Sequence, residues 1–198
     1  MSFLSQNCTL TPLTQDVLDS CDKFDCGHVD LNNFFSKDCI KYTNQLLGKT
    51  YCFLLDENPK NIVCAFTISN DSIKTIHLPN SRKNKVNRAI PHIKRSRSYP
   101  AVLIGRLGVN KDYKRKGIGV ELMDFIKSWF IDLENKTGCR YVVVDSYNEP
   151  IALNYYTSNG FEYLFQEEAQ EKEHYGISSV VLLKTRLMYF DLIVLSNI

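Results

Sequence analysis

The sequence has no run of about 20 uninterrupted apolar residues, which is the length that a helix needs to cross a lipid bilayer. Its most apolar stretch lies near the C-terminus and is broken by Lys184, Arg186 and Asp191. Residues 1–17 also lack the basic segment and the apolar core that mark a secretory signal. We therefore expect no membrane association and a cytoplasmic location.

Patterns for metal ions and disulfides are missing as well. The seven cysteines are odd in number and form no C-x-x-C pair, and the four histidines are scattered along the chain. We therefore expect reduced thiols and no metal site. The remaining composition, 44% hydrophobic and 23% charged, is typical of a globular domain. We predict a single domain that covers residues 1–198.

Acidic residues are absent between Asp71 and Asp112, although the net charge of the chain is only +2. The basic residues of this stretch are Lys74, Arg82, Lys83, Lys85, Arg88, Lys94, Arg95, Arg97, Arg106 and Lys111. They are densest at 82–97, which is called the basic segment below. Such a surface is expected to meet an anion. Three partners remain open: the phosphates of a cofactor, a nucleic acid, and the chain's own acidic residues Glu162, Glu167, Glu168, Glu171 and Glu173.

The first half of the sequence predicts a strand, a helix and a hairpin. Residues 8–12 suit a short strand, and apolar residues at helical spacing indicate a helix that Asp30 caps and Gly48 ends. Two β-branched or aromatic runs, 50–55 and 61–69, flank turn-forming residues and predict an antiparallel hairpin.

The second half predicts a β-α-β-α-β order. The expected elements are strands at 101–109 and 140–146, a helix at 117–134, a short helix from Pro150 to Gly160, and strands from 161 and at 178–187. Gly105 and Gly108 indicate a bulge in the first of these strands. Residues 187–198 suit an exchanged or covering strand. We expect a mixed α/β fold with helices on both faces of its sheet and a ligand beside the single parallel crossover.

The segment that joins the strand at 101–109 to the next helix carries the strongest chemical signal. A glycine-bearing turn at a helix N-terminus presents backbone N–H groups and the positive end of the helix dipole to an anion. The basic and glycine residues of this turn are Lys114, Arg115, Lys116, Gly117 and Gly119. Because the Walker and Rossmann patterns are absent, the alternatives are a pyrophosphate site of another kind and a purely structural turn.

Residues 103–122 resemble the acetyl-CoA motif of the GNAT superfamily of N-acetyltransferases, [QR]-x-x-G-x-[GA] after a strand, with Lys114 in place of the usual Gln or Arg. A second block that resembles the family follows at the expected distance and comprises Asn148, Ala152, Asn154, Tyr155, Tyr156, Gly160 and Phe161. The resemblance implies a mostly antiparallel sheet with a splayed parallel strand pair, and direct transfer of an acetyl group from acetyl-CoA to a primary amine.

The resemblance also implies roles for individual residues. The backbone at Leu107 and Val109 would bind the pantetheine arm and the developing oxyanion, and residues 114–119, with Ile118 among them, would bind the pyrophosphate. Asn148 and Asn154 would help to hold the cofactor, and Tyr156 would protonate the departing thiolate. Ordinary packing is the alternative for the tyrosine.

A narrower resemblance concerns the acceptor. Phe24-Asp25-Cys26-Gly27-His28, the following Leu31-Asn32-Asn33-Phe34-Phe35 and the stretch from Ile90 to Leu107 resemble GNAT toxins of toxin–antitoxin pairs, which acetylate aminoacyl-tRNA. This resemblance implies a tRNA substrate, an antitoxin partner and a homodimer as candidates. A small amine, a protein amine and a non-catalytic CoA-binding module remain open alternatives.

Overall fold

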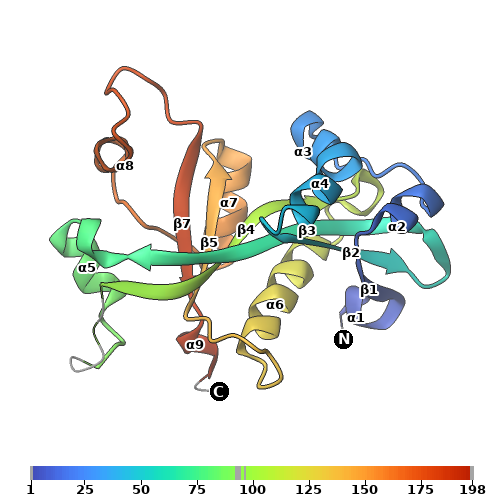
Figure 1. Cartoon of the computed structure of the whole chain (residues 1–198), viewed down its shortest axis with the longest axis horizontal. Helices are drawn as coiled ribbons and strands as arrows, with labels where there is room; N and C mark the ends of the chain where they lie inside the picture. Colours follow the sequence, from blue (N-terminus) through green and yellow to red (C-terminus); the bar gives the residue numbers. More distant parts are fainter. Residues whose placement is uncertain (1, 92–94, 96, 197–198) are drawn as a thin grey trace. The chain divides into compact units, whose positions relative to one another are not determined.

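The chain folds into alternating helices and strands, which a computed structural model describes for residues 2–91, 95 and 97–196. Internal contacts divide it into two compact units, Met1–Ser69 with Ile104–Ser128 (unit 1) and Asn70–Leu103 with Trp129–Ile198 (unit 2). The boundaries fall within β3 (Asn58–Lys74), β4 (Ser98–Val109) and α6 (Ile118–Ile131), so these elements contribute to both units (Figure 1). The single domain over residues 1–198 stays a prediction.

The strands of the described residues are hydrogen-bonded in the order β1-β2-β3-β4 in unit 1 and β3-β4-β5-β7-β6 in unit 2. The pairs are antiparallel except for β4 and β5, which run parallel. The predicted fold class, a mixed and mostly antiparallel sheet with one parallel pair and helices, is therefore confirmed. Most of the expected strands, the hairpin among them, also lie where the sequence placed them.

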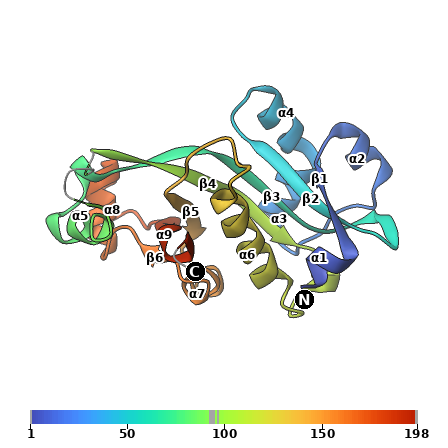
Figure 2. The same cartoon turned by 90° about the horizontal axis from the view of Figure 1, so that it is seen from below.

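Unit 1 holds helices on both faces of its strands. Its further elements are α1 (Phe3–Asn7), β1 (Cys8–Pro12), α2 (Gln15–Ser20), α3 (Val29–Asn33), a π-helical segment (Phe34–Asp38), α4 (Cys39–Asn44), β2 (Lys49–Leu55) and a 3-10 turn (Lys111–Tyr113). On one face, Phe35 packs with Cys52 of β2 in a buried cluster. On the other face, Phe125 of α6 contacts the rings of Phe53 and Phe66, with centroids 5.0 and 6.4 Å apart. Figure 2 shows α4 and α6 on these opposite faces.

The helix expected from Asp30 is present, but both of its predicted ends are wrong. His28 is the N-cap, since its side chain accepts the Leu31 N–H at 3.5 Å, and Asp30 lies in the first turn. At the other end Leu46, not Gly48, adopts a left-handed conformation, with φ of 59°. Position 48 needs a glycine for a different reason: any side chain there would clash with β3, because a Cβ would lie 2.7 Å from the Ile68 carbonyl oxygen.

Unit 2 is organised around β5 and β7. Its further elements are a 3-10 turn (Thr75–His77), α5 (Asn80–Val86), β5 (Tyr141–Tyr147), α7 (Pro150–Ser158), β6 (Glu162–Tyr163), α8 (Glu168–Tyr175), β7 (Thr185–Asp191) and α9 (Ile193–Ser196). The buried Tyr141 hydroxyl donates to the Val86 carbonyl oxygen at 2.8 Å and so ties β5 to the end of α5. The Tyr141 ring also packs edge-on against Tyr189 of β7, at 5.8 Å.

The last strand differs from its prediction. β7 begins at Thr185, and the apolar residues Val180, Val181 and Leu182, which suggested an earlier start, are exposed. The apolar run after Leu187 is no covering strand, because β7 pairs with β5 along one edge and with β6 along the other.

Membrane helices and metal sites can be assessed in the part of the chain that the structure describes. Within it, no helix is both long and apolar enough to cross a membrane. Within the same residues, His, Cys, Asp and Glu side chains form no group of three or more that suits a metal ion. All seven cysteines are free thiols.

Candidate functional site

The turn between β4 and α6 is fastened to unit 1 at its first residue. The Asn110 N–H donates to the Val63 carbonyl oxygen at 2.9 Å, and the Asn110 side-chain amide donates to the Ile62 carbonyl oxygen at 3.0 Å. The Asn110 Oδ1 accepts the Asp112 N–H at 3.2 Å, which bends the chain into the 3-10 turn. Two neighbouring carbonyl groups of β3 therefore fix the start of the predicted pyrophosphate turn.

The middle of the turn has an unusual backbone. Arg115 has φ of 60° and Gly117 has φ of 82°, both in the left-handed region. A left-handed conformation is costly for arginine, and such residues cluster at functional sites. A Cβ at Gly117 would meet no atom within 4 Å, so this side of the turn is open. The geometry suits the approach of a bulky anion to the N-terminus of α6.

The basic side chains of the turn have different surroundings. Lys114, Arg115 and Lys116 are exposed, and the Lys116 ammonium lies 5.3 Å from the centroid of the Tyr113 ring. Lys111 instead forms an ion pair with Asp25, with Nζ and Oδ2 3.0 Å apart. Ile118 is buried and anchors the first turn of α6. Three adjacent cations are therefore presented at the turn, while the fourth is neutralised.

Strand β4 carries Leu107 and Val109, both half-buried. Gly108, between them, packs closely against Cys26: a Cβ at position 108 would lie 3.2 Å from both Cβ and Sγ of Cys26, so that Cys26 would have to move by a few tenths of an ångström. At Gly105 a Cβ would meet only the Thr67 carbonyl oxygen, at 4.0 Å. Close approach of the loop that contains Cys26 therefore accounts for Gly108, and the bulge predicted from the two glycines stays a prediction.

Tyr156 lies on α7 in unit 2, next to two aromatic rings. Its ring centroid is 5.0 Å from that of Tyr155 and 5.4 Å from that of Phe161. Burial raises the pKa of the Tyr156 phenol above its ordinary value of 10.0. The hydroxyl therefore keeps its proton through the neutral range, as a hydrogen-bond donor or general acid must. On the same helix, Asn154 is exposed.

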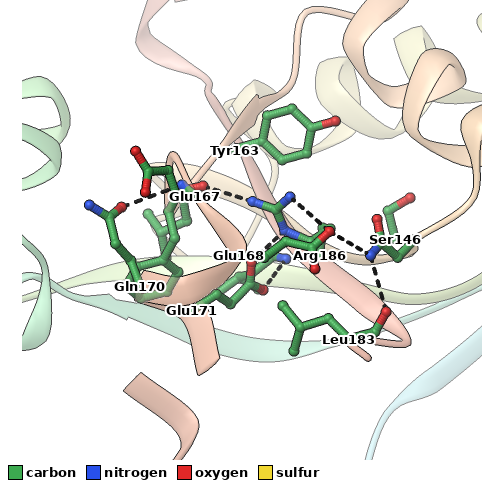
Figure 3. Close-up of polar contacts among 12 residues, drawn as sticks. Ser146, Tyr163, Glu167, Glu168, Gln170, Glu171, Leu183 and Arg186 are labelled. Atoms are coloured by element: carbon green, nitrogen blue, oxygen red, sulfur yellow. Dashed lines mark hydrogen bonds and ion pairs between the residues drawn. The ribbon is translucent and has the colours of Figure 1, made fainter. Parts of the chain in front are cut away.

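Asn148 is engaged in contacts within unit 2. Its side-chain amide donates to Oε1 of Glu168 at 3.0 Å and to the Leu183 carbonyl oxygen at 3.1 Å. Glu168 belongs to the network of Figure 3, in which the buried Arg186 donates to Oε2 of Glu171 at 2.8 Å. Asn148 thus joins the end of β5 to α8 and to the segment before β7. The role in binding the cofactor stays a prediction for Asn148, and these contacts already use its amide donors.

The predicted site residues fall into two groups. Unit 1 brings together the first group: Leu107, Val109, Lys114, Arg115, Lys116, Gly117, Ile118 and Gly119. Unit 2 contains Asn148, Asn154 and Tyr156. Sequence reasoning missed the part that Asp25 plays at the turn. The only sequence signal for Asp25 was its place in the block Phe24–His28.

The basic segment belongs to unit 2 and is only partly used by contacts within the chain. Arg82 is buried and donates to the carbonyl oxygens of Leu164 and Tyr163, and Lys85 pairs with Glu162 at 2.6 Å. Glu171, by contrast, pairs with Arg186. The exposed cations of the segment are Lys83, Arg88, Arg95 and Arg97 among the described residues, and Lys94 lies outside those residues. The acidic residues at 162–173 therefore balance the segment only in part.

Comparisons with known proteins give the class. Residues 82–163 match the acetyltransferase (GNAT) domain family. No curated protein sequence matches the chain. The match spans both sequence blocks that suggested the resemblance, and over these residues it confirms the predicted resemblance to acyltransferases of the GNAT type.

Solved structures share the fold over almost the whole chain. AtaT complexed with acetyl-methionyl-tRNAfMet is 18% identical, with a TM-score of 0.65 over 96% of this chain and 98% of that chain. A tyrosine-to-phenylalanine mutant of KacT is 17% identical, with a TM-score of 0.64 over 97% and 99%. An AtaT mutant toxin bound to acetyl-CoA and the C-terminus of the antitoxin AtaR is 18% identical, with a TM-score of 0.60 over 97% and 98%. The narrower resemblance, to GNAT toxins, is thus confirmed at the level of the fold.

Proposed function

We propose that this chain transfers the acetyl group of acetyl-CoA to the α-amino group of an aminoacyl-tRNA and acts as the toxin of a toxin–antitoxin pair. The observation that carries the proposal is the exposed cations of unit 2, among them Lys83, Arg88 and Arg97, in a stretch without acidic residues. Neutralisation of phosphates by such cations supplies most of the affinity of proteins for nucleic acids. The fold shared with AtaT, solved with an acetylated tRNA, supports the same acceptor.

Acetyl-CoA is the proposed acyl donor, and the turn after β4 is its proposed pyrophosphate site. Lys114, Arg115 and Lys116 offer positive charge beside the N-terminus of α6, and Gly117 leaves the approach open. Lys114 stands where the acetyl-CoA motif usually has Gln or Arg, and it provides a cation at that position of the turn. The backbone at Leu107 and Val109 is the proposed binding site of the pantetheine arm.

The proposed chemistry is a direct transfer. The neutral amine attacks the thioester carbonyl carbon, the carbon–sulfur bond breaks, Tyr156 donates a proton to the departing sulfur, and the amine loses a proton to solvent. An aminoacyl ester suits this route, because its amine is more acidic than an ordinary chain terminus, whose pKa is about 7.7 to 8. Such an amine is neutral without a dedicated base. The N–H groups of β4 are the proposed donors to the oxyanion.

A small polyamine fits the contacts less well as the acceptor. It would need a cluster of available carboxylates, and the acidic stretch at 162–173 is the candidate for one. Glu171 is buried against Arg186, Glu168 accepts from Asn148, and Glu162 pairs with Lys85. Internal partners therefore already occupy much of this negative charge.

The test is CoA release by the purified chain from acetyl-CoA, with bulk aminoacyl-tRNA compared against uncharged tRNA, polyamines, aminoglycosides and peptides. Acetylated amino acid recovered from the tRNA by mass spectrometry is the expected result. Turnover only on a small amine or a peptide would overturn the tRNA acceptor. Tight CoA binding without turnover on any of these acceptors would favour a non-catalytic CoA-binding module.

A further inference from the structure

The loop Phe24–His28 packs against the strand and the turn proposed to bind CoA. Its Cys26 lies close to β4, since a Cβ at position 108 would be only 3.2 Å from Cβ and Sγ of Cys26. The Asp25 carbonyl oxygen accepts the Lys111 N–H at 2.9 Å, at the start of the 3-10 turn. All of these residues belong to unit 1. Two segments about 80 residues apart in sequence therefore form one local structure.

Asp25 is the centre of this loop. Its Oδ1 accepts the Gly27 N–H at 2.8 Å and the Asn32 side-chain amide at 2.7 Å, while its Oδ2 pairs with Lys111. Asn32 in turn accepts the Cys26 N–H at 2.8 Å. One carboxylate thereby holds its own loop, the first turn of the helix at 29–44 and the turn after β4.

Gly27 meets the Lys114 side chain. A Cβ at Gly27 would lie 3.3 Å from Lys114 Nζ, so the ammonium of Lys114 rests directly over this loop. Gly27 also has φ of 72°, which strains any residue with a side chain. The backbone that Asp25 holds is therefore the surface on which the first cation of the motif is placed.

We propose that Asp25 and Gly27 are positioning residues for the pyrophosphate of CoA, which act by setting the turn and the place of the Lys114 ammonium. Lys111 serves Asp25 and does not contact the phosphates. The inference rests on the proposed CoA site but is independent of which amine is acetylated. It also gives the aspartate and glycine of the Phe24–His28 block a physical role.

The test is the affinity for CoA compared with the affinity for pantetheine, which lacks the phosphates, measured by calorimetry or by competition. Asp25→Asn is expected to weaken CoA binding about tenfold, the effect of losing one charged hydrogen bond. Gly27→Ala is expected to weaken it to a similar extent, because its Cβ strains the loop and displaces the Lys114 ammonium. Both variants should leave pantetheine binding unchanged. Asp30→Asn, an exposed acid nearby on α3, is the matched control and should change neither affinity. Circular dichroism confirms that each variant is folded.

Two results would overturn the inference. Equal losses for CoA and pantetheine would show general damage to the site, and unchanged CoA affinity would show that the loop does not act on the phosphates. Lys111→Met separates the roles of the cations further. It should weaken CoA binding no more than Asp25→Asn does, and the double variant should bind CoA as Asp25→Asn alone does. A wild-type chain that binds no CoA would overturn the donor site itself, whereas failure to acetylate tRNA would leave this inference standing.

Discussion

The Glu171 carboxylate and the Arg186 guanidinium form a buried ion pair, with Oε2 and Nε 2.8 Å apart and side chains 2% and 9% exposed. Oε1 of Glu171 accepts the Leu187 N–H at 2.6 Å, and Arg186 also donates to the Phe165 carbonyl oxygen. The pair therefore joins α8 to the first residues of β7 within unit 2.

Arg186→Met is expected to lower the free energy of unfolding by about 3–5 kcal/mol, because it leaves the Glu171 carboxylate buried without its cation. Adding Glu171→Gln should restore part of the loss, since the amide oxygen can still accept the Leu187 N–H without a buried charge. Urea unfolding measures both. Lys41→Met, which breaks an exposed pair with Asp38, is the control and should change stability by less than about 1 kcal/mol. A double variant no more stable than Arg186→Met would contradict this account.

Tyr156→Phe is expected to lower kcat by about 10²–10⁴, the usual contribution of a general acid, without weakening CoA binding. The raised pKa of the phenol adds a second expectation: the tyrosine should cause no fall in activity as the pH rises from 7 to 9. Tyr155→Phe, whose ring neighbours that of Tyr156, is the matched control. Undiminished turnover in the Tyr156 variant would leave the tyrosine a packing residue.

Lys83→Glu combined with Arg88→Glu is expected to raise KM for aminoacyl-tRNA and to reduce the salt slope of tRNA binding by about one for each phosphate that the variant no longer neutralises. The Kd for CoA should not change. Lys136→Glu is the control, because it removes an exposed cation outside the basic segment. If Lys136→Glu changed tRNA binding as much as the double variant does, the net charge of the chain, and not the position of the basic segment, would determine tRNA binding.

Leu46→Gly is expected to stabilise the chain by about 0.5–1 kcal/mol, although it removes a leucine. Leu46 is 92% exposed and has a positive φ, which costs a residue with a side chain about 1–2 kcal/mol. The greater freedom of glycine in the unfolded chain offsets part of the gain. Leu47→Gly, next in sequence and without a positive φ, should destabilise. Thermal or urea unfolding compares the two.

Asp25 is expected to stabilise the fold down to unusually low pH. The Gly27 N–H, then Lys111 and Asn32, lower its pKa from 3.8. A lowered carboxylate pKa contributes stability that is present above the unfolded value and disappears as the pH falls through the folded value. The stability difference between wild type and Asp25→Asn should therefore be constant above about pH 5 and shrink only below about pH 4. An NMR titration of the carboxyl group tests the pKa directly.

The sequence predicted those parts of the fold that depend on local pattern. The three valines of β5, Pro150 in the first turn of α7 and Gly117 in the turn before α6 are all local signals, and the structure agrees with each. The failures concern competition between distant parts of the chain. Val180–Leu182 resemble a buried strand, but nothing in their own sequence shows that they stay exposed before β7.

The candidate site divides in the same way. The cations and glycines of the turn could be identified from the local sequence, and Tyr156 could be named from the resemblance of its block to the GNAT family. That Lys111 is neutralised by Asp25, and that Asn148 donates to Glu168 and Leu183, could not be found, because these contacts join residues far apart in sequence. A count of basic residues therefore overestimates the charge that the turn offers to a phosphate.

The position of β7 between β5 and β6 has a consequence for biosynthesis. The last segment of unit 1 ends at Ser128, whereas unit 2 receives the strand between β5 and β6 only with Thr185–Asp191. At translation rates of about 5–20 residues per second, the valine-rich β5 waits some seconds on the ribosome with one edge unpaired. Slower translation of the residues between β5 and β7 should therefore favour aggregation of the nascent chain. Faster translation of these residues should favour folding of unit 2.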